Sequence, residues 1–214
     1  MIERLKSGLK QFKNFTYKEH ENLYHELENT QHPHTLFIAC SDSRVHPAML
    51  IDSKPGEVFT IRNIANTIPP LQESRKDLTT LSAIEYAVKV LEVEQIIICG
   101  HSNCGGCAAA LAATENLVDL PYTQEYLKPL EKVKKMTEKD YQPTGNHSKA
   151  ELMEKNNIVE QLTHLKEYPI IKERLKKNKL AIEGWHYDIG SGVVLVYDEI
   201  ENKFFETTPE ESTA

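Results

Sequence analysis

The chain has 214 residues, of which 40% are hydrophobic and 27% charged, a composition typical of one globular domain or at most two. Its 25 basic and 32 acidic side chains give a formal net charge of −7, which argues against a general nucleic-acid partner because such proteins need a basic surface. The 4 cysteines are too few for a disulfide scaffold, and their uneven placement is the first feature to explain.

The first residues do not have the pattern of a secretory signal. Charged side chains recur through residues 1–10, and no long apolar run follows them. The strongly apolar runs at 36–40 and 96–100 are far shorter than the roughly 20 residues of a membrane span. We therefore expect a cytoplasmic protein with reduced thiols and no membrane partner.

Residues 1–30 are expected to form an N-terminal helical arm, followed by a single α/β domain over residues 31–214. The apolar residues of the arm recur at helical spacing but form only a thin stripe, which consists of Leu5, Leu9, Phe12, Leu23 and Leu27. Helices with so little core of their own must lie on another surface, and a neighbouring subunit is one candidate. We expect a homodimer or a tetramer of dimers.

Beyond the arm, apolar runs typical of buried strands alternate with helical patterns. Strands are expected at 35–40, 57–62 and 95–99, and helices at 76–92 and 105–113. This alternation favours an α/β fold with a mainly parallel central sheet and flanking helices.

The second half of the chain is expected to begin with charged helices. The helical stretch at 122–178 is broken by Pro129, Pro143 and Pro169. Strands follow at 180–187, 193–197 and 203–205. The last two form a hairpin, so they add an antiparallel edge to the sheet.

Two of the predicted strands end in residues that commonly bind metals. Cys40 closes the first strand, and His101 and Cys104 follow the third. Functional groups collect beyond the carboxyl ends of the strands of an open α/β sheet, so we expect these side chains to meet. Two thiolates and one imidazole suit Zn²⁺, and a set of two Cys and one His leaves a fourth position open to water, as in catalytic sites.

Asp42, two residues after Cys40, has two readings. It could be the fourth zinc ligand and close the site. It could instead pair with Arg44, whose planar fork matches a carboxylate, and accept a hydrogen bond from zinc-bound hydroxide. Zinc lowers the pKa of bound water to about 7, so hydroxide would be available at neutral pH.

The remaining two cysteines differ in their surroundings. Cys99 lies inside an apolar strand and is interpreted as a core residue. Cys107 makes a C-x-x-C pattern with Cys104, which leaves a redox role open. His46 is a candidate proton relay, since it follows the acidic and basic pair closely.

At these residues the chain resembles the β-class carbonic anhydrases. The motifs that carry the resemblance are Cys40-Ser41-Asp42-Ser43-Arg44, His101-Ser102-Asn103-Cys104, Pro55-Gly56-Glu57, Arg62-Asn63-Ile64-Ala65-Asn66 and Gly184-Trp185-His186-Tyr187-Asp188. The resemblance implies one Zn²⁺ per chain on Cys40, His101 and Cys104. It implies reversible hydration of carbon dioxide to bicarbonate and a proton, with zinc hydroxide as the nucleophile and Asp42 and Arg44 orienting it.

The resemblance favours the plant-like subclass, which carries a Gln nine residues before the first cysteine, as Gln31 does here. It implies that Gln31, Phe59, Tyr86 and the backbone amide of Gly105 line the carbon dioxide pocket, some of them from a neighbouring subunit.

The other subclass has an inhibitory bicarbonate site that uses a Trp three residues before the first cysteine. This chain has Phe37 there, although Arg62 and Tyr187 resemble the other members of that site. The difference favours an open zinc position with Asp42 paired to Arg44.

Other functions are open on the sequence alone. The same site could hydrolyse carbon disulfide or carbonyl sulfide. The chain could also be a non-catalytic zinc or redox regulator, or a protein whose charged helices mediate an interaction. The presence of both Asp42 and Arg44 favours an enzyme.

Overall fold

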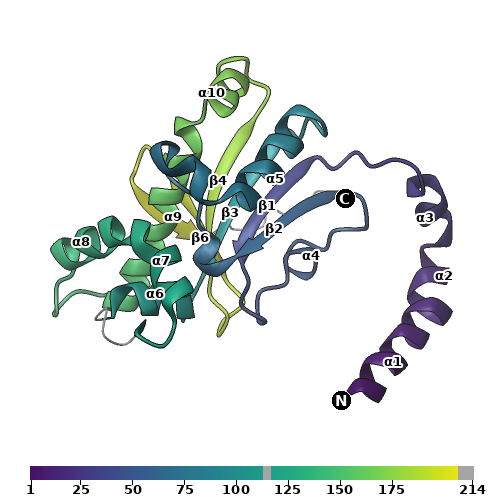
Figure 1. The fold of residues 1–214 in the computed structure, drawn as a ribbon, viewed down its shortest axis with the longest axis horizontal. Helices are drawn as coiled ribbons and strands as arrows, with labels where there is room; N and C mark the ends of the chain where they lie inside the picture. Colours follow the sequence, from purple (N-terminus) through teal and green to yellow (C-terminus); the bar gives the residue numbers. More distant parts are fainter. Residues whose placement is uncertain (113–116, 207–214) are drawn as a thin grey trace.

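The computed structural model describes residues 1–112 and 117–206 (Figure 1). Its helices are α1 (Ile2–Gln11), α2 (Tyr17–Glu19), α3 (Glu21–Leu27), α4 (Pro47–Leu50), α5 (Leu78–Lys89), α6 (Gly105–Leu111), α7 (Pro121–Leu127), α8 (Glu131–Asp140), α9 (Lys149–Glu167) and α10 (Pro169–Lys176). Its strands are β1 (Thr35–Cys40), β2 (Val58–Asn63), β3 (Gln95–His101), β4 (Ala181–Tyr187), β5 (Val194–Asp198) and β6 (Lys203–Glu206). Short π- or 3₁₀-helical segments lie at Phe12–Thr16, Ile64–Asn66, Leu71–Lys76 and Lys128–Leu130.

The strands form one six-stranded sheet in the order β2-β1-β3-β4-β5-β6 within the described residues. The pairs from β2 to β4 are parallel, whereas β4–β5 and β5–β6 are antiparallel. The predicted α/β class, the parallel centre and the antiparallel edge are therefore confirmed. Strand β1 lies between β2 and β3, so its carboxyl end opens beside the ends of two parallel neighbours.

Strand β1 is buried on both faces, as a continuous apolar run in a parallel sheet requires. Leu36 and Ile38 pack into a core that includes α5 and α9, and Phe37 and Ala39 pack with Ile97 on the opposite face. The first four of these side chains are 0% exposed. Burial of each of the larger side chains contributes about 1.5–3 kcal/mol, which makes β1 a rigid base for the residues that follow it.

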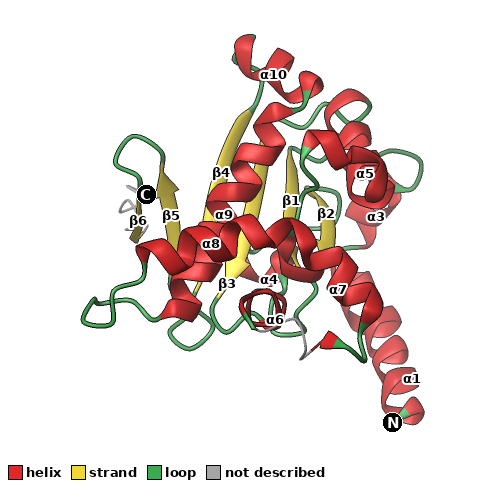
Figure 2. Cartoon of the chain, turned by 60° about the vertical axis from the view of Figure 1, so that its left-hand side comes forward, coloured by secondary structure: helices red, strands yellow, loops and turns green. Residues whose placement is uncertain are grey.

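Helix α9 lies against β3 and β4, as Figure 2 shows, and glycines make this close approach possible. A Cβ atom at Gly184 of β4 would lie 2.7 Å from Ile158 Cγ2 and 2.8 Å from Leu162 Cδ1. Glycine therefore allows the helix to pack directly on the strand backbone. This contact brings the polar face of α9 to the end of the sheet where β3 stops.

The helix expected at 76–92 is shorter in the structure. Asp77 caps α5, with its side chain accepting a hydrogen bond from the Thr80 N–H at 3.0 Å, and the residues before it form a separate 3₁₀ segment. Helix α4, which is 4 residues long, was not expected because one turn is too short to show a period. The expected end of α6 at Ala113 falls outside the described residues.

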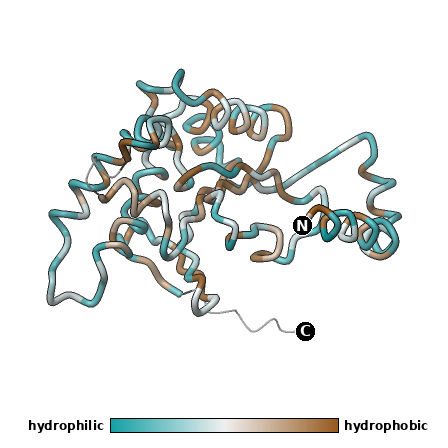
Figure 3. Tube along the Cα trace, turned by 60° about the horizontal axis from the view of Figure 1, so that its bottom comes forward, coloured by the Kyte–Doolittle hydropathy of each residue, from teal (hydrophilic) through white to brown (hydrophobic). Residues whose placement is uncertain are grey.

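Helices α1 to α3 extend away from the sheet (Figure 1). In Figure 3 the hydrophobic stretches gather in the body of the fold, while the N-terminal helices are largely hydrophilic with hydrophobic residues between. Leu5, Leu9 and Phe15 are more than half exposed. Among the described helices, none combines the length and apolar character that crossing a bilayer requires.

Candidate metal centre

The structure brings together Cys40, His101 and Cys104. Cys40 and His101 end β1 and β3, and Cys104 is the residue immediately before α6. Their ligand atoms all lie within 4.8 Å of one another, and the three residues are at most 4% exposed. Parallel strands carry these residues to one edge because β1 and β3 are adjacent in the sheet.

The three side chains fit a tetrahedral Zn²⁺ ion. Two sulfurs bound at about 2.3 Å with tetrahedral angles lie about 3.8 Å apart. The sulfurs of Cys40 and Cys104 are 3.9 Å apart. His101 Nδ1 lies 2.9 Å from the Ser102 carbonyl, which can only accept, so Nδ1 carries the proton. Nε2 is buried and has no hydrogen-bond partner among the described residues, as expected of a nitrogen that binds a metal.

The two thiols depend on a cation for their ionised form. Hydrogen-bonding contact with Cys104, followed by burial, raises the pKa of Cys40 to about 12. Contact with Cys107 raises the pKa of Cys104 to about 12, with burial adding to it and contact with Cys40 opposing it. A bound cation must therefore displace protons from sulfur, and its affinity rises with pH.

Asp42 lies beside the three ligands but is paired with Arg44. The backbone N–H and Nε of Arg44 both donate to Asp42 Oδ1 at 2.9 Å, and Nη2 donates to Oδ2 at 2.8 Å. Asp42 Oδ2 lies 3.9 Å from His101 Nε2. The Arg44 guanidinium holds the pKa of Asp42 well below its usual range. The Asp42 carboxylate is consequently ionised and fixed, and it lies outside the cluster of ligand atoms.

Arg62 braces the segment that carries these groups. Its Nε donates to the Cys40 carbonyl at 3.1 Å, and its Nη2 donates to the Asp42 carbonyl at 2.6 Å. Phe37, which replaces the Trp of the other subclass, is fully buried with its ring edge-on to Trp185 at 5.8 Å. Arg62 thus binds two main-chain carbonyl groups, and Phe37 is a core residue.

The expected substrate pocket is not complete within one chain. Phe59 and Tyr86 face each other with ring centroids 6.0 Å apart, but Phe59 lies four positions before Asn63, the partner of Cys40 in the sheet. Four positions along a strand are about 13 Å. Gln31 is exposed and precedes β1, whereas Gly105 directly follows the ligand Cys104. Only Gly105 lies at the metal centre of its own chain.

The other candidate residues have different surroundings. Cys99 is 0% exposed in the core, as expected. Cys107 is buried in α6 next to Cys104. His46 is exposed at the start of α4.

Helix α9 supplies buried polar residues that sequence reasoning missed. Glu154 accepts a hydrogen bond from the Cys104 N–H at 3.1 Å. Asn157 donates to the Ala65 carbonyl at 2.8 Å, and Gln161 accepts from the Ile68 N–H at 2.7 Å. No local pattern marks them, because polar residues on a charged helix are typical of a solvated face.

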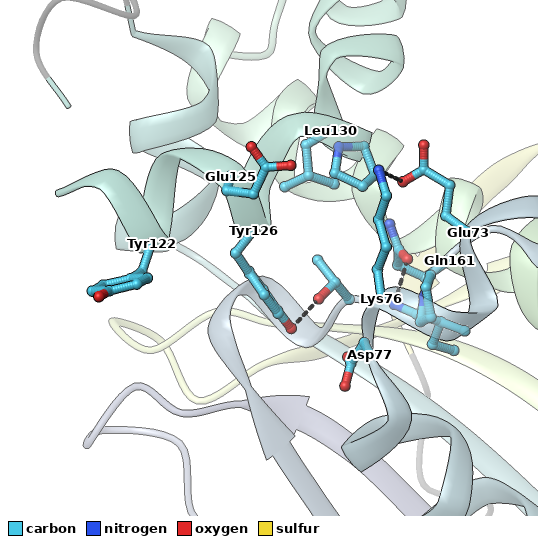
Figure 4. Close-up of a pocket in the computed structure, with 12 residues that line it drawn as sticks. Glu73, Lys76, Asp77, Tyr122, Glu125, Tyr126, Leu130 and Gln161 are labelled. Atoms are coloured by element: carbon cyan, nitrogen blue, oxygen red, sulfur yellow. Dashed lines mark hydrogen bonds and ion pairs between the residues drawn. The ribbon is translucent and has the colours of Figure 1, made fainter. Parts of the chain in front are cut away.

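A pocket of about 220 Å³ lies between α7 and the segment after β2 (Figure 4). The Tyr126 hydroxyl lies 2.5 Å from that of Thr67, and Lys76 pairs with Glu73 at 3.2 Å. None of the three ligands lines this pocket. Its walls are mostly apolar, and the possible metal-binding group found among the described residues, the Cys-His-Cys cluster, lies outside it.

Comparisons with known proteins agree with this geometry. The model of the carbonic anhydrase family matches residues 35–194. A carbonic anhydrase of Helicobacter pylori strain J99 is 38% identical over 207 residues, covering 95% of this chain and 93% of the relative. Beta carbonic anhydrase 3 of Arabidopsis thaliana is 35% identical over 210 residues, and the match covers 97% of this chain and 80% of the relative. The chain belongs to the β-carbonic anhydrase family. The solved β-carbonic anhydrase CcaA superimposes on this β-carbonic anhydrase with a TM-score of 0.91 at 36% identity, covering 98% of this chain and 93% of that one.

Proposed function

We propose that the chain catalyses the reversible hydration of carbon dioxide at a zinc ion held by Cys40, His101 and Cys104. The observation that carries the proposal is a buried Cys-His-Cys cluster with an ionised, immobilised Asp42 beside it, in a chain of the carbonic anhydrase family. Three ligands leave a fourth position for water, which is typical of catalytic zinc. The names of the relatives favour this reaction over hydrolysis of carbon disulfide or a regulatory role.

Zinc, when bound, supplies a Lewis acid that lowers the pKa of a water to about 7 and so provides hydroxide near neutral pH. Asp42 accepts a hydrogen bond from the O–H of the attacking hydroxide, and Arg44 keeps both carboxylate oxygens in place for this. The hydroxide lone pair then forms the new C–O bond while one C–O π bond of carbon dioxide breaks. The products would be bicarbonate and a proton, and the proton would pass to buffer.

We also propose that the substrate pocket forms between two subunits. Gln31, Phe59 and Tyr86 lie away from the metal centre of their own chain, and Tyr86 is 45% exposed. We therefore place them at the carbon dioxide pocket of a neighbour, opposite the Gly105 amide, in a homodimer or a tetramer of dimers. The exposed apolar side chains of the arm at residues 1–30, which precedes the domain at 31–214, support such an assembly. Two β-carbonic anhydrases of Sordaria macrospora are tetrameric, and one matches with a TM-score of 0.77 at 27% identity, covering 97% of this chain and 98% of that one. Size-exclusion chromatography with light scattering measures the molar mass of the assembly, and a monomer would contradict this proposal.

We also propose a cytoplasmic location and the plant-like subclass. All four cysteines are unpaired thiols, which suits a reducing compartment. Gln31 and the pairing of Asp42 with Arg44 support the subclass with an open zinc position. Cell fractionation tests the location.

The proposed function is tested by stopped-flow hydration of carbon dioxide, with zinc content measured on the same samples at several pH values. The wild-type protein is expected to hydrate carbon dioxide, and His101→Ala to lose both zinc and activity. A zinc-loaded wild-type protein without activity would contradict the proposal. An open zinc site should lose activity gradually as pH falls through about 7, whereas a much steeper loss below about pH 8 would indicate that Asp42 closes the zinc site instead of pairing with Arg44.

A further inference from the structure

A buried carboxylate lies directly behind one of the metal ligands. Glu154, on α9, is 4% exposed, and its Oε1 accepts a hydrogen bond from the backbone N–H of Cys104 at 3.1 Å. Its Oε2 lies 3.2 Å from Nε2 of His186, which is 3% exposed on β4. The carboxylate thus links a helix and a strand distant in sequence to the backbone of a ligand.

The pairing of Glu154 differs from that of the other buried carboxylate on the same helix. Glu160, also on α9, is bound by Lys132 at 2.7 Å and by His164 at 2.8 Å. Among the described residues, Glu154 has no lysine or arginine partner at ion-pair distance. Burying a carboxylate is costly, and a buried ion pair often adds no net stability, so the burial of Glu154 calls for a role other than stabilising the fold.

Cys104 lies in a turn where the Glu154 carboxylate can fix its backbone position. Cys104 follows Asn103, which has a left-handed φ of 56°, in the turn between β3 and α6. Other contacts hold the earlier part of this turn; among them, the Ser102 N–H donates to the Tyr187 carbonyl at 2.9 Å, and Arg44 donates to the Asn103 carbonyl at 3.0 Å. Glu154 fixes the backbone of the ligand itself.

We propose that Glu154 is a positioning residue for Cys104, with His186 fixing the carboxylate in turn. Glu154 sets the backbone position from which the Cys104 sulfur reaches the metal together with Cys40 and His101. The inference rests on the proposed zinc centre. Partners that hydrogen-bond to a residue binding the metal, without touching the ion themselves, commonly change metal affinity by about 10–100-fold when they are lost.

The test compares variants that change either the length of the Glu154 side chain or its charge, but not both. Glu154→Asp keeps the charge but withdraws the carboxylate from the Cys104 N–H by one methylene. Glu154→Gln keeps the length and an acceptor oxygen but removes the charge. Glu160→Asp and Glu160→Gln are matched controls, because Glu160 is equally buried on the same helix and does not touch a ligand.

Two readouts are taken on the full-length protein: the rate of zinc transfer to a colorimetric chelator, and the thiolate-to-metal absorption band after replacement of zinc by Co²⁺. We expect Glu154→Asp to release zinc about 10–100-fold faster than wild type and to shift the Co²⁺ band. We expect Glu154→Gln to stay near wild type, as both Glu160 variants should, even if their unfolding midpoints fall.

Two results would overturn the positioning role. One is release from Glu154→Asp no faster than from Glu160→Asp, and the other is release from Glu154→Gln as fast as from Glu154→Asp. A wild-type protein that binds no zinc would overturn the zinc centre as well, so failure of the two proposals is distinguishable.

Discussion

Replacement of Asp42 by Asn tests how the site orients its nucleophile. The change keeps the size of the side chain but removes the charge that faces Arg44. Two of the three hydrogen bonds from Arg44 reach Oδ1 and one reaches Oδ2. In the Asn variant one of these positions becomes an NH₂ group, which faces a donor and can no longer accept.

The structure separates the effect on folding from the effect on activity. The Asp42 and Arg44 side chains are 17% and 46% exposed, so loss of the pair should change the free energy of unfolding by about 1 kcal/mol or less. Zinc should stay bound, because Asp42 is not among the clustered ligand atoms. Activity should fall about 10²–10³-fold, or about 2.7–4 kcal/mol, the usual cost of losing one preorganised group at a reacting centre.

The assay is kcat/KM for carbon dioxide hydration by stopped flow, with zinc content and a urea unfolding curve on the same samples. Asp119→Asn is the matched control, since Asp119 is exposed and outside the site. An Asp42→Asn protein with full activity would refute the orienting role. A variant that lost its zinc would refute the claim that Asp42 is not a ligand.

Further predictions concern the ligands, the extra cysteine, the packing of α9 and the pH dependence. Cys40→Ser should abolish tight zinc binding, and a full zinc complement by elemental analysis would contradict this. Mild oxidant should join Cys104 and Cys107 only after zinc is removed; intact-mass analysis showing a rapid disulfide with zinc retained would rule out Cys104 as a ligand. Gly184→Ala should lower the free energy of unfolding in urea by about 1–3 kcal/mol, because the new Cβ would lie 2.7 Å from Ile158 Cγ2, and an unchanged midpoint would refute the packing argument. The folded-state pKa of Asp42 is lowered, so its contribution to stability is complete above its unfolded value of about 3.9 and is lost only as pH falls below that value; its carboxyl signal in NMR should not titrate between pH 5 and 9.

The centre of the parallel sheet could be predicted because β1 and β3 are buried on both faces. The run from Leu36 to Cys40 is apolar throughout. Its last residue could therefore be placed at the carboxyl end of the parallel strands, where functional groups collect. Strand β2 begins one residue later than expected, at Val58, since Ile61 is its one buried residue and the strand gives a weaker signal. Helix α5 begins after Asp77 because local capping decides its start.

The Cys-His-Cys cluster could be predicted because Cys40 and His101 end adjacent parallel strands, Cys104 follows shortly after, and all three have distinctive chemistry. Glu154 could not, because its partners Cys104 and His186 are 50 and 32 positions away. Only the packing of α9 against the sheet brings them together. The pocket residues Phe59 and Tyr86 were expected from the resemblance, and the fold of one chain leaves them apart from the ligands.

We propose above all that the Cys-His-Cys cluster holds the zinc on which carbon dioxide hydration depends. The most direct test removes zinc with a chelator and titrates it back while hydration is measured by stopped flow. Activity should disappear with the metal and return in proportion to added zinc, with saturation at one ion per chain. Hydration that persists in metal-free protein, or zinc uptake that restores none of it, would contradict the claim.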